Sequence, residues 1–300
     1  MTTPTIRTEP SLPIRLSPGD RVGIVAGSGK LPINVAERLV AAGHSPFVAL
    51  VEGEADRNSF LTSCEHEFLA LENFAALVPV MRRHNVTHIV LAGGVDRRPN
   101  WRAVRPNLAL LRILPRAIAA LARGDDGLLR ILVRGLEDYG FKVVGAHEIL
   151  PDILSPQGLM TRIAPQKGDW RDLDAALEAA LAIGKLDIGQ GAVSIGGRVV
   201  ALEGIEGTDC LLARVADMRD HGRLAGKKRG VLVKCSKPGQ EKRADLPTIG
   251  PKTVEGAHAA GLAGIGVEAG SSLILDFGPM VARADQLGLF VVGLPPGGRE

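Results

Sequence analysis

Residues 21–43 read RVGIVAGSGKLPINVAERLVAAG and contain a strand, a glycine turn and a helix in succession. The apolar run Arg21–Ala26 predicts a short buried strand, which leads directly into the glycine turn. Apolar residues then recur at helical spacing as far as Gly43, and Pro32 is tolerated because it stands in the first helical turn. A strand that runs into a helix in this way is the first half of a parallel-sheet crossover unit.

The same alternation of strands and helices continues downstream of this unit. Further strands are predicted at Phe47–Val51, His88–Leu91 and Phe141–Gly145. Helices are predicted at Phe74–Arg83, Leu108–Leu121 and Gly127–Tyr139. We therefore expect an α/β protein that begins with a Rossmann-like, parallel-sheet domain.

The second half of the chain shows a different pattern. A helix near Leu173–Ile183 is followed by two short strands around Gly196-Gly197, which predicts a hairpin with a two-residue turn. Gly230–Lys234 and Leu289–Leu294 are further predicted strands. This half is expected to be a mixed α/β domain. The predicted boundaries are a leader over 1–20, the Rossmann-like domain over 21–152, a linker over 153–169 that is rich in proline and glycine, and the C-terminal domain over 170–300.

Composition narrows the possible classes of protein. The chain has 300 residues, of which 45% are hydrophobic and 3% aromatic, so a disordered or fibrous chain is excluded. The net charge of +3 is too small to indicate a nucleic-acid partner. The three cysteines have no close spacing, which favours a reducing, cytoplasmic compartment and excludes a disulfide framework. We find no signal-peptide core and no apolar run of membrane-spanning length.

The glycine turn Gly27, Ser28, Gly29 is the first candidate binding site. A turn of this kind lets backbone N–H groups at a helix N-terminus approach a phosphate, and the helix dipole favours an anion there. The dinucleotide fingerprint fails because Pro32 stands where its third glycine is needed. The phosphate-binding loop of nucleotide hydrolases fails as well, since Leu31 replaces its serine or threonine. A turn without a ligand stays the alternative.

The second candidate site is LAGGVDRRP, in which Gly94, Asp96 and Arg97 follow a predicted strand. Ligands of open α/β sheets bind at the carboxyl ends of strands, although a solvated turn is an equal alternative. The stretch 97–124 that follows contains seven arginines and no acid. Its arginines alternate with Trp101 and several leucines, so it is a candidate for contact with anionic lipid or simply a charged helix face.

The third candidate site lies in ALEGIEGTD (201–209) and VLVKCSKPGQEKRADLPTIGPKT (231–253). Hard carboxylate oxygens suit Mg²⁺, whereas lysines and threonine hydroxyls near glycine turns suit phosphate oxygens. The carboxylate candidates are Glu206, Asp209 and Asp245. The phosphate-binding candidates are Thr208, Lys234, Lys237 and Thr253. Surface positions without a function are the alternative for any one of them.

Six motifs in this order, IVAGSGKLP, LAGGVDR, GDDGLLR, GQGAVS, ALEGIEGTD and KPGQEKRADLPTIG, resemble the UDP-2,3-diacylglucosamine pyrophosphatase family of lipid A biosynthesis. The likeness is to the two-domain type and not to the metallophosphoesterase that performs the same task elsewhere. It runs from Arg21 to about Leu294. The resemblance also adds Asp126 and Gln190, from the third and fourth motifs, to the substrate-binding residues.

The resemblance implies a chemistry and a location. It implies Mg²⁺-dependent hydrolysis of UDP-2,3-diacylglucosamine to UMP and 2,3-diacylglucosamine 1-phosphate (lipid X), with Asp245 as the essential acidic residue. Asp209 or Glu206 would complete a carboxylate pair with Asp245. The resemblance further implies a homodimer that is peripheral on the cytoplasmic face of the inner membrane.

Two functions from other classes stay open on the sequence. A nicotinamide-dependent oxidoreductase would use the glycine turn for its dinucleotide, and Pro32 counts against it. A non-catalytic protein that binds a nucleotide sugar or a lipid would need the glycine loops but not the acidic residues.

Overall fold

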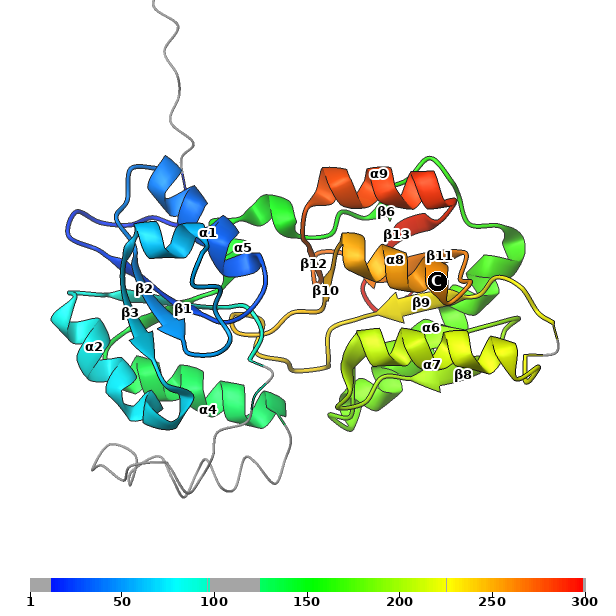
Figure 1. The fold of residues 1–300 in the computed structure, drawn as a ribbon, viewed down its shortest axis with the longest axis horizontal. Coiled ribbons are helices and arrows are strands. Elements are labelled where there is room, and N and C mark those ends of the chain that lie inside the picture. The colour runs from blue at the N-terminus through cyan, green and yellow to red at the C-terminus, as the bar shows by residue number, and fades with distance from the viewer. Residues whose placement is uncertain (1–11, 96, 98–124, 225, 299–300) are drawn as a thin grey trace, which may run out of the picture. The chain divides into compact units, whose positions relative to one another are not determined.

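A computed structural model describes residues 12–95, 97, 125–224 and 226–298 of the chain (Figure 1). The chain divides between Pro151 and Asp152 into two compact units. Within the described residues, no helix is long and apolar enough to cross a membrane. The predicted helix Leu108–Leu121 and the arginines that follow Arg97 lie outside the described residues.

The first unit contains a five-stranded sheet in which every neighbouring pair of strands is parallel. Its strands are β1 (Val22–Ala26), β2 (Phe47–Val51), β3 (Glu65–Leu69), β4 (His88–Ala92) and β5 (Lys142–Val144). The strand order is β3-β2-β1-β4-β5, so the direction of winding reverses between β1 and β4. The helices are α1 (Leu31–Ala41), α2 (Leu77–Arg83), α4 (Asp125–Asp138) and α5 (Ala146–Ile149). The short 3-10 helices are η1 (Phe60–Ser63) and η2 (Leu71–Ala76).

Apolar strands explain why this sheet is the core of the first unit. Every residue of β1, β2 and β4 is buried, as expected for parallel strands that are covered on both faces. Side chains of β1 and β2 pack against Val35 and Leu39 of α1, which the 3.6-residue period brings to one side of that helix. The Rossmann-like parallel domain predicted from the sequence is therefore confirmed.

The second unit contains a six-stranded mixed sheet in the order β6-β13-β11-β9-β7-β8. Its strands are β6 (Gly158–Leu159), β7 (Gly191–Ser194), β8 (Val199–Leu202), β9 (Val231–Lys234), β11 (Gly264–Glu268) and β13 (Phe290–Leu294). The central strands β9, β11 and β13 are parallel, whereas β6, β7 and β8 are antiparallel to their neighbours. Two short strands, β10 (Thr248–Ile249) and β12 (Leu273–Ile274), form a separate parallel pair. The mixed character predicted for this half is confirmed.

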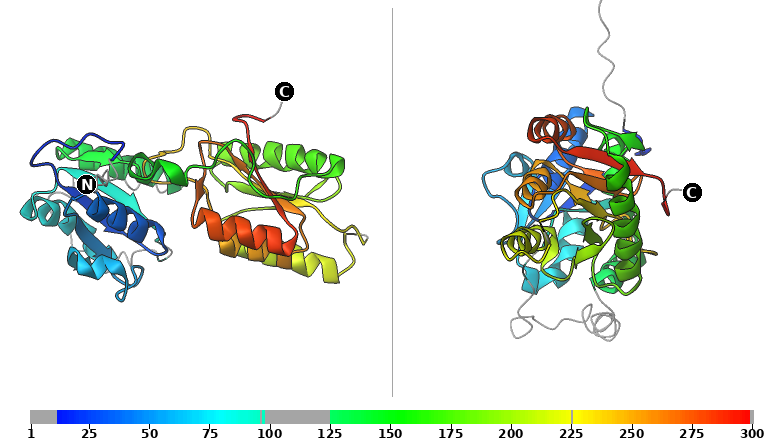
Figure 2. Two further views of the ribbon diagram at one scale, coloured as in Figure 1. Left: turned by 90° about the horizontal axis from the view of Figure 1, so that it is seen from above. Right: turned by 90° about the vertical axis from the view of Figure 1, so that its right-hand side faces the viewer.

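Helices cover both faces of this second sheet. They are α6 (Lys167–Lys185), α7 (Gly207–Asp220), α8 (Pro251–Ala259) and α9 (Phe277–Leu287). Alternate residues of β9 explain the two layers: Val231 and Val233 pack in the cluster that includes α6, and Leu232 packs in the cluster that includes α7, α8 and α9. Figure 2 shows α6 in green on one side of the sheet and the other three helices, in yellow to red, on the opposite side.

The predicted hairpin is present as β7 and β8. Gly196 and Gly197 both have positive φ, at 65° and 77°, as a tight two-residue hairpin turn requires. The buried carboxylate of Asp172 accepts hydrogen bonds from both of these backbone N–H groups and from the hydroxyl of Ser194. The stretch suggested as a linker contributes β6, which pairs with β13 in the second sheet, and the helix expected near Leu173 begins at Lys167.

Candidate functional site

Two glycine turns meet at the carboxyl edge of the first sheet, between β1 and β4. Open α/β sheets bind their ligands where the winding direction reverses, and in this unit that point lies between these two strands. The N–H of Ser28 donates to the carbonyl of Gly94 at 2.7 Å, and the N–H of Gly94 donates back to Ser28 at 3.1 Å. The N–H of Gly27 donates to the carbonyl of Ala92 at 2.9 Å. The turns predicted as separate binding sites therefore form one structure.

The glycines of this structure have different roles. A side chain at Gly27 would overlap the carbonyl of Gly94, and one at Gly93 would overlap the carbonyl of Ser28. These two glycines allow the turns to pack, and the N–H groups of Gly27 and Ser28 are used in doing so. Gly29 is exposed, has a φ of +87° and has no atom within 4 Å of the position of a Cβ. It stands just before α1, whose N-terminal N–H groups lack partners within the helix.

Arg97 is the described cation nearest in sequence to the β4 turn. Its backbone N–H donates to the carboxylate of Glu54 at 2.8 Å, and its guanidinium pairs with Glu72 at 2.5 Å. The Glu72 carboxylate raises the pKa of Arg97 above its usual value. In this conformation Arg97 is bound to acids of its own chain. Asp96 and the side chain of Asp126, which lies in α4, fall outside the described residues.

Polar side chains gather at the carboxyl edge of β9 in the second unit. Lys234, the last residue of β9, is 5% exposed, and its Nζ donates to the hydroxyl of Thr208 at 2.8 Å. The Thr208 hydroxyl donates in turn to Oε1 of Glu203 at 2.5 Å, so one hydroxyl connects a buried lysine with a buried glutamate. Thr208 stands in the first turn of α7, which places it beside the strand end. Two predicted phosphate-binding residues, Lys234 and Thr208, are thus brought together.

Gln190 borders the same group of residues. Its backbone carbonyl accepts the N–H of Cys235 at 3.0 Å, and its own N–H donates to Glu203 at 3.3 Å. The side-chain oxygen of Gln190 is buried, with no hydrogen-bond partner among the described residues. Buried polar atoms are almost always hydrogen bonded. An acceptor without a partner beside this group of residues is therefore consistent with the ligand contact predicted for Gln190.

Asp245 lies half-buried on the loop that follows β9. Its Oδ2 accepts a hydrogen bond of 2.6 Å from the side-chain amide of Gln240, which is 7% exposed. Lys237, at the start of the same loop, pairs with Asp187 at 2.6 Å. The Asp245 carboxylate is therefore oriented by the loop, and the Lys237 ammonium group is bound to an acid of its own chain.

The other predicted carboxylates lie in separate ion pairs. Asp209 pairs with Lys252 at 2.5 Å where both side chains are largely exposed, and Glu206 pairs with Arg214 at 2.5 Å. Thr253 accepts a long hydrogen bond of 3.4 Å from the N–H of Gly250 at the start of α8. Across the described ranges, no three histidine, cysteine, aspartate or glutamate side chains form a group that could hold a metal ion.

Of these carboxylates, that of Asp245 fits one kind of Mg²⁺ site. Mg²⁺ in proteins that act on phosphates is commonly held by one or two carboxylates together with the phosphate oxygens of the substrate. Asp245 is the half-buried member of the predicted set and has a fixed orientation, so it is the best candidate for such a ligand.

Sequence reasoning missed several polar residues that support this site. Glu268, the last residue of β11, is 9% exposed, and its Oε2 accepts the N–H of Ser236 at 3.1 Å and the Ser236 hydroxyl at 2.5 Å. Gln240 was missed as well, although it lies inside the KPGQEKRAD motif. A glutamate that ends an apolar strand was the available signal for Glu268. Its partner could not be found, because it depends on the pairing of β11 with β9.

The burial of Cys235 shows that solvent is excluded from the end of β9. The residue is 1% exposed, and burial raises the pKa of its thiol to about 12, with the nearby acids Glu268 and Glu203 adding to the effect. A thiol with that pKa stays protonated at neutral pH and is a poor nucleophile. Cysteine chemistry is therefore not expected at this site.

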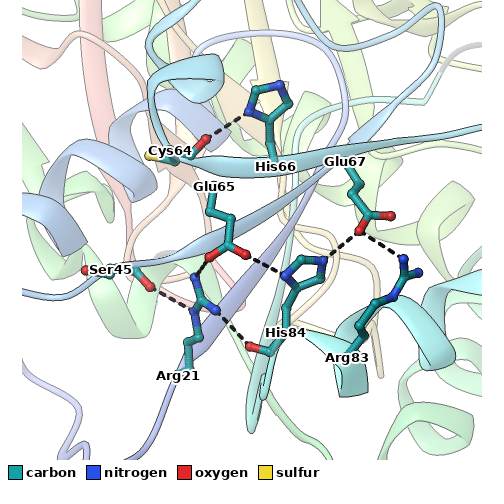
Figure 3. Close-up of polar contacts among 8 residues, drawn as sticks. All are labelled: Arg21, Ser45, Cys64, Glu65, His66, Glu67, Arg83 and His84. Carbon is teal, nitrogen blue, oxygen red and sulfur yellow. Dashed lines mark hydrogen bonds and ion pairs between the residues drawn. The ribbon is translucent and has the colours of Figure 1, made fainter.

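A further polar cluster lies at the amino edge of the first sheet, away from the carboxyl ends of its strands (Figure 3). The ring nitrogens of His84 each lie 2.6 Å from a carboxylate oxygen, one of Glu65 and one of Glu67. The guanidinium of Arg21 donates to Glu65 at 2.5 Å and to the carbonyl of His84 at 2.9 Å. Because parallel α/β sheets bind ligands at the opposite edge, we assign this cluster to the stability of β3.

Comparison with known proteins agrees with the resemblance of the motifs. Residues 21–153 match the family model of the LpxI N-terminal domain, and residues 156–292 match that of the LpxI C-terminal domain. The chain is also similar to a protein of Caulobacter vibrioides named UDP-2,3-diacylglucosamine pyrophosphatase LpxI. The two are 40% identical over 277 residues, which cover 92% of this chain and 98% of the relative. With both of its units matched in order and over nearly their full length, the chain belongs to the LpxI family.

Proposed function

We propose that this protein is a hydrolase that cleaves the pyrophosphate bond of UDP-2,3-diacylglucosamine to give UMP and lipid X, with Mg²⁺ as cofactor. The likeness to the Caulobacter protein of that name, over nearly the whole of both chains, is the observation that carries the proposal. In the reaction a water oxygen bonds to one phosphorus as the bridging P–O bond breaks, and the two protons of the water pass to the two products and the solvent.

The chemistry requires neutralisation of negative charge. A pyrophosphate diester carries two charges that repel a nucleophile, so positive groups and a fixed carboxylate are needed around it. Lys234 is suited to bind a phosphate oxygen because it is held rigidly by Thr208 and by the carbonyl of Thr248. Gln190 would accept a hydrogen bond from the substrate through its orphaned side-chain oxygen.

Asp245 is the residue proposed to act on the attacking water or on the metal. Its carboxylate is oriented by the hydrogen bond from Gln240, as either role requires. When bound, Mg²⁺ would polarise the phosphate oxygens and neutralise part of their charge. Asp209 and Glu206 are the further candidates that the sequence predicts, and each lies in an ion pair that substrate binding would have to rearrange.

Exposed apolar side chains on two loops near this site fit a substrate with acyl chains. The most exposed large apolar side chains in the described residues are Ile205 at 84%, Leu186 at 71% and Ile188 at 52%. They stand on two loops that meet where Gly189 packs directly against the backbone of Glu203, the glutamate bound to Thr208. We propose that these side chains meet the acyl chains of the substrate at the inner membrane, where the enzyme acts as a peripheral homodimer.

The proposal is tested with purified protein and UDP-2,3-diacylglucosamine in ¹⁸O-labelled water. We expect UMP and lipid X in equal amounts when Mg²⁺ is present, loss of turnover with EDTA, and one labelled oxygen in one of the two products. The label also identifies which phosphorus is attacked. Absence of UMP in the presence of Mg²⁺, or a thermal shift with NADH in place of hydrolysis, would contradict the proposal.

A further inference from the structure

The side chain of Gln240 connects two functional groups of the loop that follows β9. Its Oε1 accepts the backbone N–H of Lys237 at 2.9 Å, and its Nε2 donates to Oδ2 of Asp245 at 2.6 Å. The residue is 7% exposed, so water competes little for either bond. One buried amide thus spans the loop from its basic start to its acidic end.

The orientation of this amide follows from its partners. A backbone N–H can only donate, so the atom that faces Lys237 must be the oxygen of the amide. The NH₂ group must then face Asp245, where it offers a hydrogen-bond donor to the carboxylate. A donor in that position fixes the plane of the two carboxylate oxygens.

The loop itself is bound to the sheet near its start, at Ser236. Both the N–H and the hydroxyl of Ser236 donate to the buried carboxylate of Glu268, which ends the neighbouring strand β11. Gln240 is therefore fixed relative to the rigid part of the unit, and through Gln240 so is Asp245. If the side chain of Gln240 served only to fold this loop, its bond to Lys237 would be sufficient and the second bond to Asp245 would not be needed.

We propose that Gln240 is a positioning residue, which holds the carboxylate of Asp245 in one orientation for the reaction. This inference rests on the proposed function, in which Asp245 acts on water or metal. The charged residues of the same loop have partners in the structure: Lys237 pairs with Asp187, Arg243 with Glu241, and Lys242 donates to Ser271. These groups are unchanged in the variants below, so their effects cancel in the comparison.

The test compares two substitutions of nearly the same size. Gln240→Glu keeps an acceptor for the N–H of Lys237 but places a carboxyl oxygen, in place of the amide donor, against Asp245. Gln240→Met removes both bonds. Both variants should lower kcat about tenfold with little change in KM, as expected when a catalytic carboxylate is no longer held in place. A role in folding alone predicts instead that Gln240→Glu, which keeps the bond to Lys237, retains the wild-type kcat.

A matched control and a double variant separate the possible outcomes. Gln286→Glu makes the same substitution on an exposed glutamine of α9 and should leave kcat unchanged. If Gln240 acts through Asp245, Gln240→Met should lower kcat no further in a protein that already carries Asp245→Asn. A wild-type kcat in the folded Gln240→Glu protein would overturn the inference. Absence of hydrolysis by the wild-type protein would instead refute the proposed function.

Discussion

At the scale of single residues, the hydroxyl of Thr208 is the feature that joins Lys234 to Glu203. Thr208→Val keeps the shape of the side chain but leaves both buried charged groups without that partner. We expect a loss of about 1–3 kcal/mol in the free energy of unfolding, the cost of an unsatisfied buried polar group. Urea unfolding measures it. Thr253→Val is the control, because the single 3.4 Å bond of Thr253 is long, and it should cost less than about 1 kcal/mol.

The cysteines provide a second test at this scale. Cys210 is exposed, whereas Cys235 is buried with a thiol pKa of about 12, so iodoacetamide at pH 7.5 should modify Cys210 and spare Cys235 in the folded protein. Peptide mass spectrometry reads out both positions, and protein unfolded in urea serves as the control in which all cysteines react. Equal rates at Cys210 and Cys235 in the folded protein would show that the edge of β9 is open to solvent.

At the scale of elements, substitutions in the glycine turns that follow β1 and β4 separate glycines needed for folding from a glycine available for binding. Gly27→Ala should destabilise the protein by about 3 kcal/mol, the upper range for overpacking, because the new methyl group meets the carbonyl of Gly94. Gly29→Ala meets no neighbour, and its positive φ should cost only about 1–2 kcal/mol. If Gly29 lies against the substrate, Gly29→Val should raise KM by a large factor, whereas the melting temperature should fall only slightly. Equal costs of stability for the two alanine variants would contradict this assignment.

The cluster that joins β3 to α2 predicts a dependence of stability on pH. Hydrogen bonds from Arg21 and His84 lower the pKa of the Glu65 carboxyl. The resulting stabilisation is complete above the usual glutamate pKa of about 4.3 and is lost as the pH falls through the lowered value. The difference in unfolding free energy between wild type and Glu65→Gln should therefore shrink below pH 4. Glu37→Gln, on an exposed glutamate of α1, should show no such trend.

The local sequence pattern predicted those strands and turns that are specified by their own consecutive residues. The strand that became β1 and the Gly-Gly hairpin were found because burial and turn chemistry are written into consecutive residues. Five of the strands were not predicted: β3, β6, β10, β11 and β12. β3 reads EHEFL and lies at the sheet edge, where its two glutamates contact His84. β11 contains Gly264 and Gly266, which are needed because Phe290 and Leu173 pack over them, a contact that only the folded chain reveals.

At the scale of the whole molecule, each unit has a sheet with its own buried cluster and its own group of predicted site residues. The sequence pointed to the residue types of the second group, because glycines, lysines and acids crowd into two short motifs. The sequence alone could not show which of these residues lie together in the folded protein. Asp209 pairs with Lys252 from a distant segment, and Asp245 is oriented by an amide of its own loop whose burial depends on the folded unit, so neither contact can be read from the motifs.

The central claim is that Asp245 is needed for turnover and not for folding or binding. Asp245→Ala should unfold at nearly the wild-type temperature and lose about 10²-fold or more in kcat, the usual scale for a general base. The direct measurement is UMP release together with mass spectrometry of the lipid bound to each purified protein. We expect intact UDP-2,3-diacylglucosamine in the variant and only lipid X in the wild type. UMP release at a near-normal rate by Asp245→Ala would contradict it.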